Sequence, residues 1–116
     1  MALVFLGRIL FGLYFIYSGY NHFKHVKHTS EYAKMKGVPM PREATLLTGL
    51  LMILGGIGFF LNIGLGLSAV ILLVFMVPTT FIMHQFWKIK DPAHQMGEKI
   101  NFLKNLALIG ALLMLM

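Results

Sequence analysis

The sequence predicts an all-α integral membrane protein, an antiparallel bundle of four transmembrane helices in a single domain. Two features of the composition support this fold class: of 116 residues, 58% are hydrophobic and only 12% are charged, against roughly 25% charged in ordinary globular chains. A soluble chain of this length could not bury so much apolar surface, because small domains bury the smallest fraction of theirs. The third feature is the pattern, since four apolar stretches alternate with short polar connections and each approaches the ~20 residues that cross a bilayer.

Cysteine is absent from the sequence, which excludes disulfides, thiolate-bound metals and iron–sulfur clusters held by this chain. The net charge of +6 would favour nucleic-acid binding in a soluble protein. Here most of the basic residues lie in two connections between apolar stretches, which is typical of membrane topology. We therefore expect membrane lipid, and no nucleic acid, as a partner.

The first predicted span is residues 2–23, and it contains one charged residue, Arg8. Steps of three and four residues place Arg8 on one helical face with Gly12, Phe15, Gly19 and His22. The two glycines permit close approach of another helix, so we expect this face to be buried.

A basic connection follows, and within it residues 29–36 suit a short surface helix, with Tyr32 and Met35 at the membrane interface. The tripeptide Gly37-Val38-Pro39 favours a turn that ends any helix there. The basic residues of this connection are Lys24, Lys27, Lys34, Lys36 and Arg42.

The second and third predicted spans are residues 44–62 and 65–87. The second span is rich in glycine, which favours tight packing. The connection between these spans is too short for anything except a tight hairpin, so they are expected to be antiparallel neighbours. Pro78 is expected to bend the third span.

The fourth predicted span is residues 100–116, with Lys104 and Asn105 near its start and a second basic connection before it. Four spans place both chain ends on one side of the membrane. The two polar connections carry the Lys and Arg excess, so the positive-inside rule predicts that they are cytoplasmic and that both termini are outside.

Several short motifs, in order and spacing, resemble the DoxX family of small four-helix membrane proteins of bacteria and archaea. They are Gly7-Arg8-Ile9-Leu10-Phe11-Gly12-Leu13, Gly37-Val38-Pro39, the glycine-rich second span, His84-Gln85-Phe86-Trp87 and Phe102-Leu103-Lys104-Asn105-Leu106-Ala107. The resemblance implies the cytoplasmic (inner) membrane and a quinone-linked redox setting, because the family is named after a subunit of a thiosulfate:quinone oxidoreductase. An acidic residue within the second span could pair with Arg8, but the nearest one, Glu43, lies before the span. The partner of Arg8 therefore cannot be assigned from the sequence.

The topology brings polar residues from the ends of the four spans to one depth at the side of the basic connections. They are His22, Glu43, His84, Trp87, Lys104 and Asn105. A quinone head group needs hydrogen-bond donors at its carbonyls, an aromatic wall and a route for protons. His84 and Asn105 can donate, Trp87 can stack, and Lys104 or Arg8 can stabilise a reduced anion.

Each of these residues also has a structural interpretation. His84 and Trp87 can be an interfacial pair that anchors and caps a helix end. Arg8 can tie helix ends together. Lys104 can extend to the lipid headgroups while Asn105 caps the helix start.

Metal and haem are not expected, although His22, His25 and His28 follow an H-x-x-H-x-x-H spacing, because the last two lie in a solvated basic segment. The leading hypothesis is a membrane subunit of a quinone-linked oxidoreductase system that receives electrons from a redox partner protein. The alternative is a non-enzymatic membrane subunit that assembles or stabilises a partner complex. Catalysis by the chain itself is left open, and the glycine faces would also suit a homo-oligomer.

Overall fold

The computed structural model describes residues 2–115, which form five α-helices and one short 3₁₀ helix. The long helices are α1 (Ala2–Lys24), α3 (Pro41–Leu61), α4 (Leu65–Met83) and α5 (Pro92–Leu115). The short elements are α2 (Val26–Met35) and the 3₁₀ helix η1 (Phe86–Lys88). The all-α class is confirmed for residues 2–115, and α2 lies where a short surface helix was expected. The antiparallel bundle of four spans stays a prediction.

Three segments within residues 2–115 are long and apolar enough to cross a membrane: Ala2–Lys24, Pro41–Leu61 and Leu65–Lys88. Helix α5 is of sufficient length, but Glu98 and Lys99 lie in its first half and Lys104 lies at its middle. A fourth crossing therefore stays a prediction, and Met116, the last residue of the predicted fourth span, lies outside the described residues.

The apolar segment Leu65–Lys88 agrees with the predicted third span, residues 65–87, but the helices themselves do not end and begin where the predicted spans do. Helix α4 ends at Met83, before the predicted end at Trp87, and α5 begins at Pro92, well before residue 100. The reason is a helix cap, since the Asp91 carboxylate accepts a hydrogen bond from the His94 backbone N–H at 3.0 Å. An aspartate at this position followed by proline is a favourable helix start. The chain must turn between the two helices, so the regular helix α4 ends before the apolar segment does.

Glycine allows α1 and α3 to pack closely along their length. A β-carbon added to Gly12 would lie 2.5 Å from the Gly56 carbonyl oxygen, and one added to Gly19 would lie 2.6 Å from the Gly49 carbonyl oxygen. Such distances are inside van der Waals contact, so only glycine fits. The glycine face predicted for α1 is confirmed.

The remaining contacts run from α3 to α4 and from α4 to α5, while α2 packs mainly on α3. The largest fully buried side chains are Phe15, Phe59, Leu72 and Leu112, one from each long helix. Because no extended contact joins α1 to α5 in residues 2–115, the bundle is not closed on that side.

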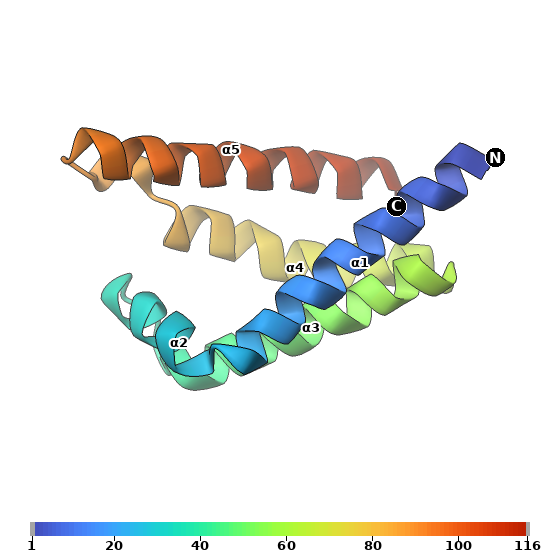
Figure 1. The fold of residues 1–116 in the computed structure, drawn as a ribbon, viewed down its shortest axis with the longest axis horizontal. Helices are drawn as coiled ribbons and strands as arrows, with labels where there is room; N and C mark the ends of the chain where they lie inside the picture. The colour runs from blue at the N-terminus through green and yellow to red at the C-terminus, as the bar shows by residue number, and fades with distance from the viewer. Residues whose placement is uncertain (1, 116) are drawn as a thin grey trace.

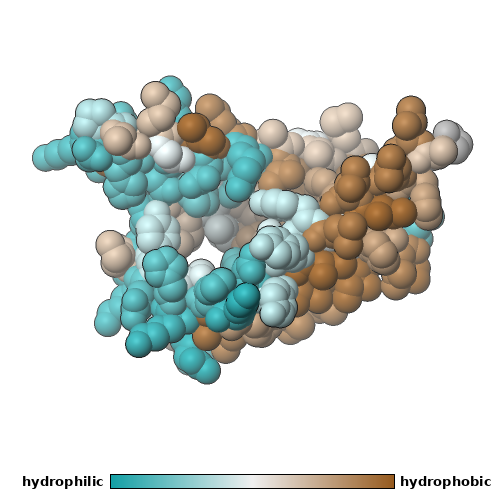
Figure 2. All heavy atoms as spheres, viewed as in Figure 1, coloured by the Kyte–Doolittle hydropathy of each residue, from teal (hydrophilic) through white to brown (hydrophobic). Residues whose placement is uncertain are grey.

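The long helices come together at the end of the molecule where both chain ends lie, and they diverge toward the end where α2 lies (Figure 1). Hydrophilic residues gather at the α2 end, and hydrophobic residues cover the rest of the visible face (Figure 2). Both basic connections are therefore at the same end of the molecule.

Candidate functional site

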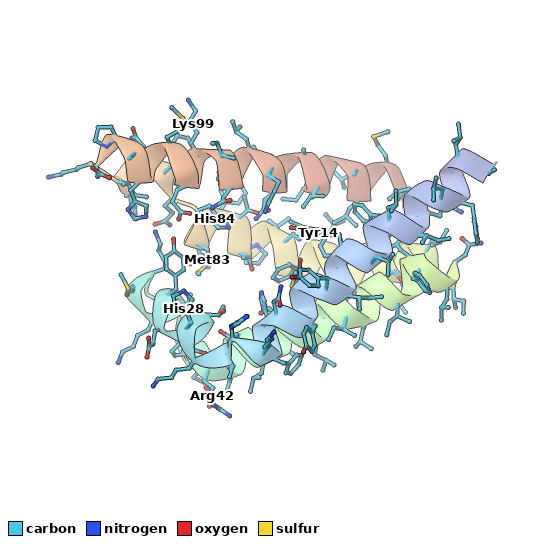
Figure 3. All side chains as sticks on the ribbon, viewed as in Figure 1. Tyr14, His28, Arg42, Met83, His84 and Lys99 are labelled. Carbon is cyan, nitrogen blue, oxygen red and sulfur yellow. The ribbon has the colours of Figure 1, made fainter. Side chains whose placement is uncertain are left out.

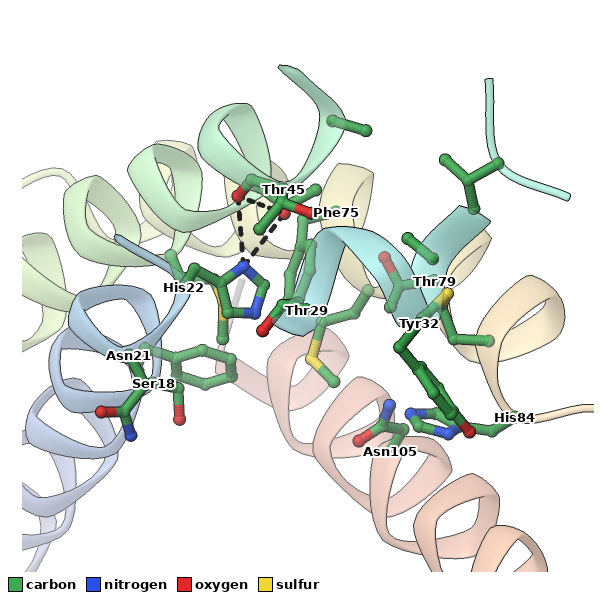
Figure 4. Close-up of a pocket in the computed structure, with 18 of the residues that line it drawn as sticks. Ser18, Asn21, His22, Thr29, Tyr32, Thr45, Phe75, Thr79, His84 and Asn105 are labelled. Atoms are coloured by element: carbon green, nitrogen blue, oxygen red, sulfur yellow. Dashed lines mark hydrogen bonds between the residues drawn. The ribbon is translucent and has the colours of Figure 1, made fainter. Parts of the chain in front are cut away.

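A cavity of about 380 Å³ lies where the helices diverge. This volume falls in the range of roughly 300–1,000 Å³ that is typical of small-molecule sites. Residues of all five α-helices line it, and Figure 4 shows the cavity with His22 on one side and His84 with Asn105 on the other. Its apolar wall includes Phe15, Met52, Phe75, Met76 and Met83.

His22 comes from the last turn of α1 and is held by the first turns of α3. Its ring Nδ1 lies 3.3 Å from the Thr45 carbonyl oxygen and 3.2 Å from the Thr48 hydroxyl oxygen. A carbonyl oxygen only accepts, and the Thr48 hydroxyl already donates to the same carbonyl at 3.0 Å. We therefore assign the hydrogen to His22 Nδ1, which leaves Nε2 of the neutral ring as an acceptor.

His84 occupies the opposite wall, directly after α4 ends. Its Nδ1 lies 3.3 Å from a carboxylate oxygen of Glu98 in α5. Figure 3 shows His84 in the space between α5 and the helices below it, whereas Lys99 and Arg42 point away from the molecule.

Glu98 is almost completely buried, with 4% of its surface exposed, yet it has four polar neighbours. The Tyr32 hydroxyl donates to it at 2.7 Å, the Asn101 amide donates at 3.1 Å, and the Lys36 ammonium lies 3.4 Å away. The fourth is His84. These contacts satisfy a buried carboxylate, which would otherwise be very unfavourable.

The contacts also determine the charge of Glu98. Burial by itself raises the pKa of a carboxyl group, but the hydrogen bonds from Tyr32, Asn101 and His84 outweigh it and lower the pKa of Glu98 to about 2. Burial, reinforced by the hydrogen bond to Glu98, raises the pKa of Tyr32 well above its ordinary value. At neutral pH the carboxylate is therefore ionised and the tyrosine is protonated.

Asn105 and Lys104 complete the α5 side of the cavity. Asn105 lines it with 8% of its surface exposed, and no group in residues 2–115 forms a hydrogen bond with its carboxamide. The exposed Lys104 ammonium lies 6.0 Å from the centre of the Tyr14 ring of α1. A buried amide that faces a cavity without a partner is suited to a polar ligand atom.

The structure thus brings four of the predicted site residues to one cavity: His22, His84, Lys104 and Asn105. Trp87 is 49% exposed and packs edge-on against Phe86 and Phe102, outside the cavity lining.

Arg8 does not line the cavity either. It lies ~21 Å along α1 from His22 by helical rise, and its guanidinium donates a hydrogen bond to the Asn62 side-chain oxygen at 3.0 Å. This contact ties α1 to the hairpin between α3 and α4. Glu43 is exposed in the first turn of α3.

Sequence reasoning missed Glu98 and the role of Tyr32. Glu98 precedes an apolar stretch among charged residues and therefore resembles a solvated residue. A signal was present, because the buried residues of α5 are Glu98, Asn105 and Leu112. They are seven residues apart and lie on one helical face.

No three histidine, aspartate or glutamate side chains in the part of the chain that the structure describes are grouped so as to hold a metal ion. His25 and His28 are both exposed.

Comparison with known families adds one finding. The DoxX family profile matches residues 3–85. The chain belongs to the DoxX family. The match ends before Glu98 and Asn105, so the α5 side of the cavity lies outside the matched part. No curated protein and no solved structure matches the chain. With its apolar helices, this is a DoxX-family membrane protein.

Proposed function

We propose that this protein is a membrane subunit of a quinone-linked oxidoreductase system and that its cavity binds the quinone head group. One observation carries the proposal: a cavity at the polar end of apolar helices has hydrogen-bonding side chains on two opposite sides and an aromatic and methionine wall between them. A quinone has the matching form, a flat ring with one oxygen at each end.

The residues present fit such a ligand. The Phe75 ring offers an apolar face, and the Asn105 carboxamide lines the cavity without a hydrogen-bond partner within residues 2–115. His22 is held through Nδ1 by Thr45 and Thr48, and His84 is held through Nδ1 by Glu98, which fixes the direction of both rings. A bound quinone would supply two-electron, two-proton redox chemistry, and a partner protein would deliver the electrons.

Binding by the purified protein in lipid nanodiscs tests the proposal. Titration with a short-chain benzoquinol, the reduced form whose hydroxyls can donate to the Nε2 atoms of His22 and His84, is expected to saturate at about one ligand per chain. His84→Ala is expected to weaken quinol binding about tenfold or more, because the Nε2 atom that accepts a hydrogen bond from the ligand is lost, while circular dichroism shows an intact helical fold. His94→Ala, at an exposed histidine of α5, is the matched control. Unsaturable binding, or equal affinity in the His84 and His94 variants, would contradict the proposal.

The alternative is a non-enzymatic subunit that assembles a partner complex. The unclosed side of the bundle between α1 and α5 favours it, because a partner helix could complete the packing there. The complex isolated in native lipid distinguishes the two. Quinone co-purifying with the chain supports the first, and a stable partner complex without quinone supports the second.

A further inference from the structure

We propose that the cavity selects the reduced form of its ligand, so that an aromatic diol (a quinol) binds more tightly than the corresponding quinone, and that Glu98 is the positioning residue responsible for this at His84. The inference rests on the proposed function and adds the redox state that the site prefers.

A quinone and its quinol have nearly the same shape and differ at two oxygens. Each quinone carbonyl only accepts hydrogen bonds, whereas each quinol hydroxyl also donates. A site whose fixed groups are acceptors leaves those groups unpaired when the quinone binds, and unpaired buried polar groups discriminate strongly between otherwise similar ligands.

At His84 the acceptor is set by Glu98. The carboxylate is ionised and can only accept, so the hydrogen of the neutral ring is on Nδ1, which lies 3.3 Å from it. The opposite edge of the ring, with Nε2, faces the cavity near Asn105 (Figure 4). Nε2 therefore presents a lone pair to the ligand.

At His22 the same result arises from different partners. The Thr45 carbonyl and the Thr48 hydroxyl oxygen both take the hydrogen of Nδ1, and Nε2 points toward the cavity (Figure 4). Two histidines from α1 and from the end of α4 thus present acceptors on two sides of one space.

The other polar groups at the cavity do not reverse this preference. The carboxamides of Asn21 and Asn105 and the hydroxyls of Tyr14, Ser18, Thr29 and Thr79 can both donate and accept, so each can pair with either form of the ligand. Lys104 only donates, but it is exposed to solvent beside Tyr14. The two histidines are the groups with one fixed direction.

The first test compares the two redox forms of one short-chain ligand on the protein in nanodiscs. Measurements are made without oxygen at about pH 8, where imidazole is neutral. The quinol is expected to bind about tenfold more tightly or better, equivalent to about 1.4 kcal/mol. Equal or tighter binding of the quinone would overturn this inference alone. Absence of binding by both forms would overturn the proposed function with it.

The second test is Glu98→Gln. A carboxamide can donate to Nδ1 and so permits the tautomer with the hydrogen on Nε2. The quinol preference is expected to fall about tenfold or to reverse, whereas a purely structural role would weaken both forms equally and would overturn the assignment. Glu31→Gln, at an exposed residue of α2, is expected to keep the wild-type preference.

Nitrogen NMR of the wild-type protein with ¹⁵N-labelled histidine tests the same point if Glu98→Gln does not fold. The spectra are expected to show the hydrogen on Nδ1 in His22 and His84 at about pH 8. A hydrogen on Nε2 of His84 would overturn the inference whether or not a quinone binds.

Discussion

Glu98 is the residue on which the open end of this bundle depends most. It receives contacts from Tyr32 in α2 and from Lys36 directly after α2. His84, after the end of α4, and Asn101, in the same helix as Glu98, provide the others. A carboxylate in a mostly apolar protein persists only when such donors satisfy it. The same contacts fix the direction of the His84 ring at the cavity.

The glycines between α1 and α3 give a prediction at this scale. In Gly12→Ala the new methyl group would meet backbone atoms of Gly56 and Phe60, which cannot move without separating the helices. We expect a loss of stability of about 1–3 kcal/mol, measured by thermal unfolding in detergent. Gly66→Ala, where a β-carbon meets nothing within 4 Å, is the control and is expected to be neutral or slightly stabilising. Equal unfolding temperatures for the two variants would contradict the close packing.

The positions of some site residues in the fold were predictable from the sequence, and those of others were not. His22 and Asn105 follow from topology, because the ends of neighbouring antiparallel helices lie at the same depth. Arg8 could be assigned to a buried face, but its partner Asn62 lies in a turn with positive φ, and turn geometry is not readable from apolar periodicity. The pairing of Tyr32 with Glu98 joins residues of distant segments, for which a single sequence carries no signal.

At the scale of the elements, α2 is attached to α5 by side chains rather than by helix packing. Its main packing partner is α3, and its links to α5 are the Tyr32 hydroxyl and the Lys36 ammonium at Glu98. Only these two side chains therefore attach the α2 segment to the α5 wall of the cavity.

Removal of one of these contacts is expected to loosen α2. In Tyr32→Phe the hydroxyl that donates to Glu98 at 2.7 Å is lost, and the carboxylate keeps its other donors. We expect faster hydrogen exchange of the amides of Val26–Met35, by about threefold to tenfold if one hydrogen bond is lost. Tyr17→Phe, at a tyrosine that is 66% exposed on α1, serves as the control. Unchanged exchange in Tyr32→Phe would show that α3 alone holds α2.

The same link predicts a pH dependence. The pKa of Glu98 is lowered from 4.5 to about 2, so its contribution to holding α2 is complete above about pH 4.5 and is lost as the pH falls toward 2. Protonation of His84 during acidification adds a positive charge beside the carboxylate, as Lys36 already does, and so does not weaken the link before Glu98 itself is protonated.

Hydrogen exchange of α2, corrected for its intrinsic pH dependence, is the measurement. We expect constant protection between pH 7 and pH 5 and a loss only below about pH 4. Glu98→Gln should show no such transition. A loss of protection near pH 6 would mean that a histidine, not Glu98, controls the position of α2.

Element boundaries were predictable where the chain carries explicit signals that the sequence reasoning used. The tripeptide Gly37-Val38-Pro39 indicated the end of α2. The start of α5 carried the equally clear pair Asp91-Pro92, but hydropathy was given priority and the polar first turns were assigned to a connection. A helix that extends beyond the apolar layer has no hydropathy signal at its polar end.

For the whole molecule, the divergence of the long helices places both basic connections at the end that contains the cavity (Figures 1 and 2). The native chain has no cysteine, so single cysteines report topology without background. Met35→Cys and Met96→Cys, both at well-exposed residues, are expected to react with an impermeant maleimide from one side of the membrane. Ile63→Cys, in the opposite hairpin, is expected to react from the other side. Reaction of Met35→Cys and Met96→Cys from different sides would place the α2 and α5 walls of the cavity on opposite sides of the membrane and would contradict this arrangement.

The central claim is that the space between the diverging helices holds a quinone head group. Photolabelling with an azidoquinone in proteoliposomes, followed by mass spectrometry of the peptides, tests it most directly. We expect adducts in the cavity-lining segments 14–22 and 75–84, and we expect excess unlabelled quinol to suppress them. Adducts confined to outward-facing residues such as Leu10 and Leu47, with no effect of the competitor, would contradict the claim.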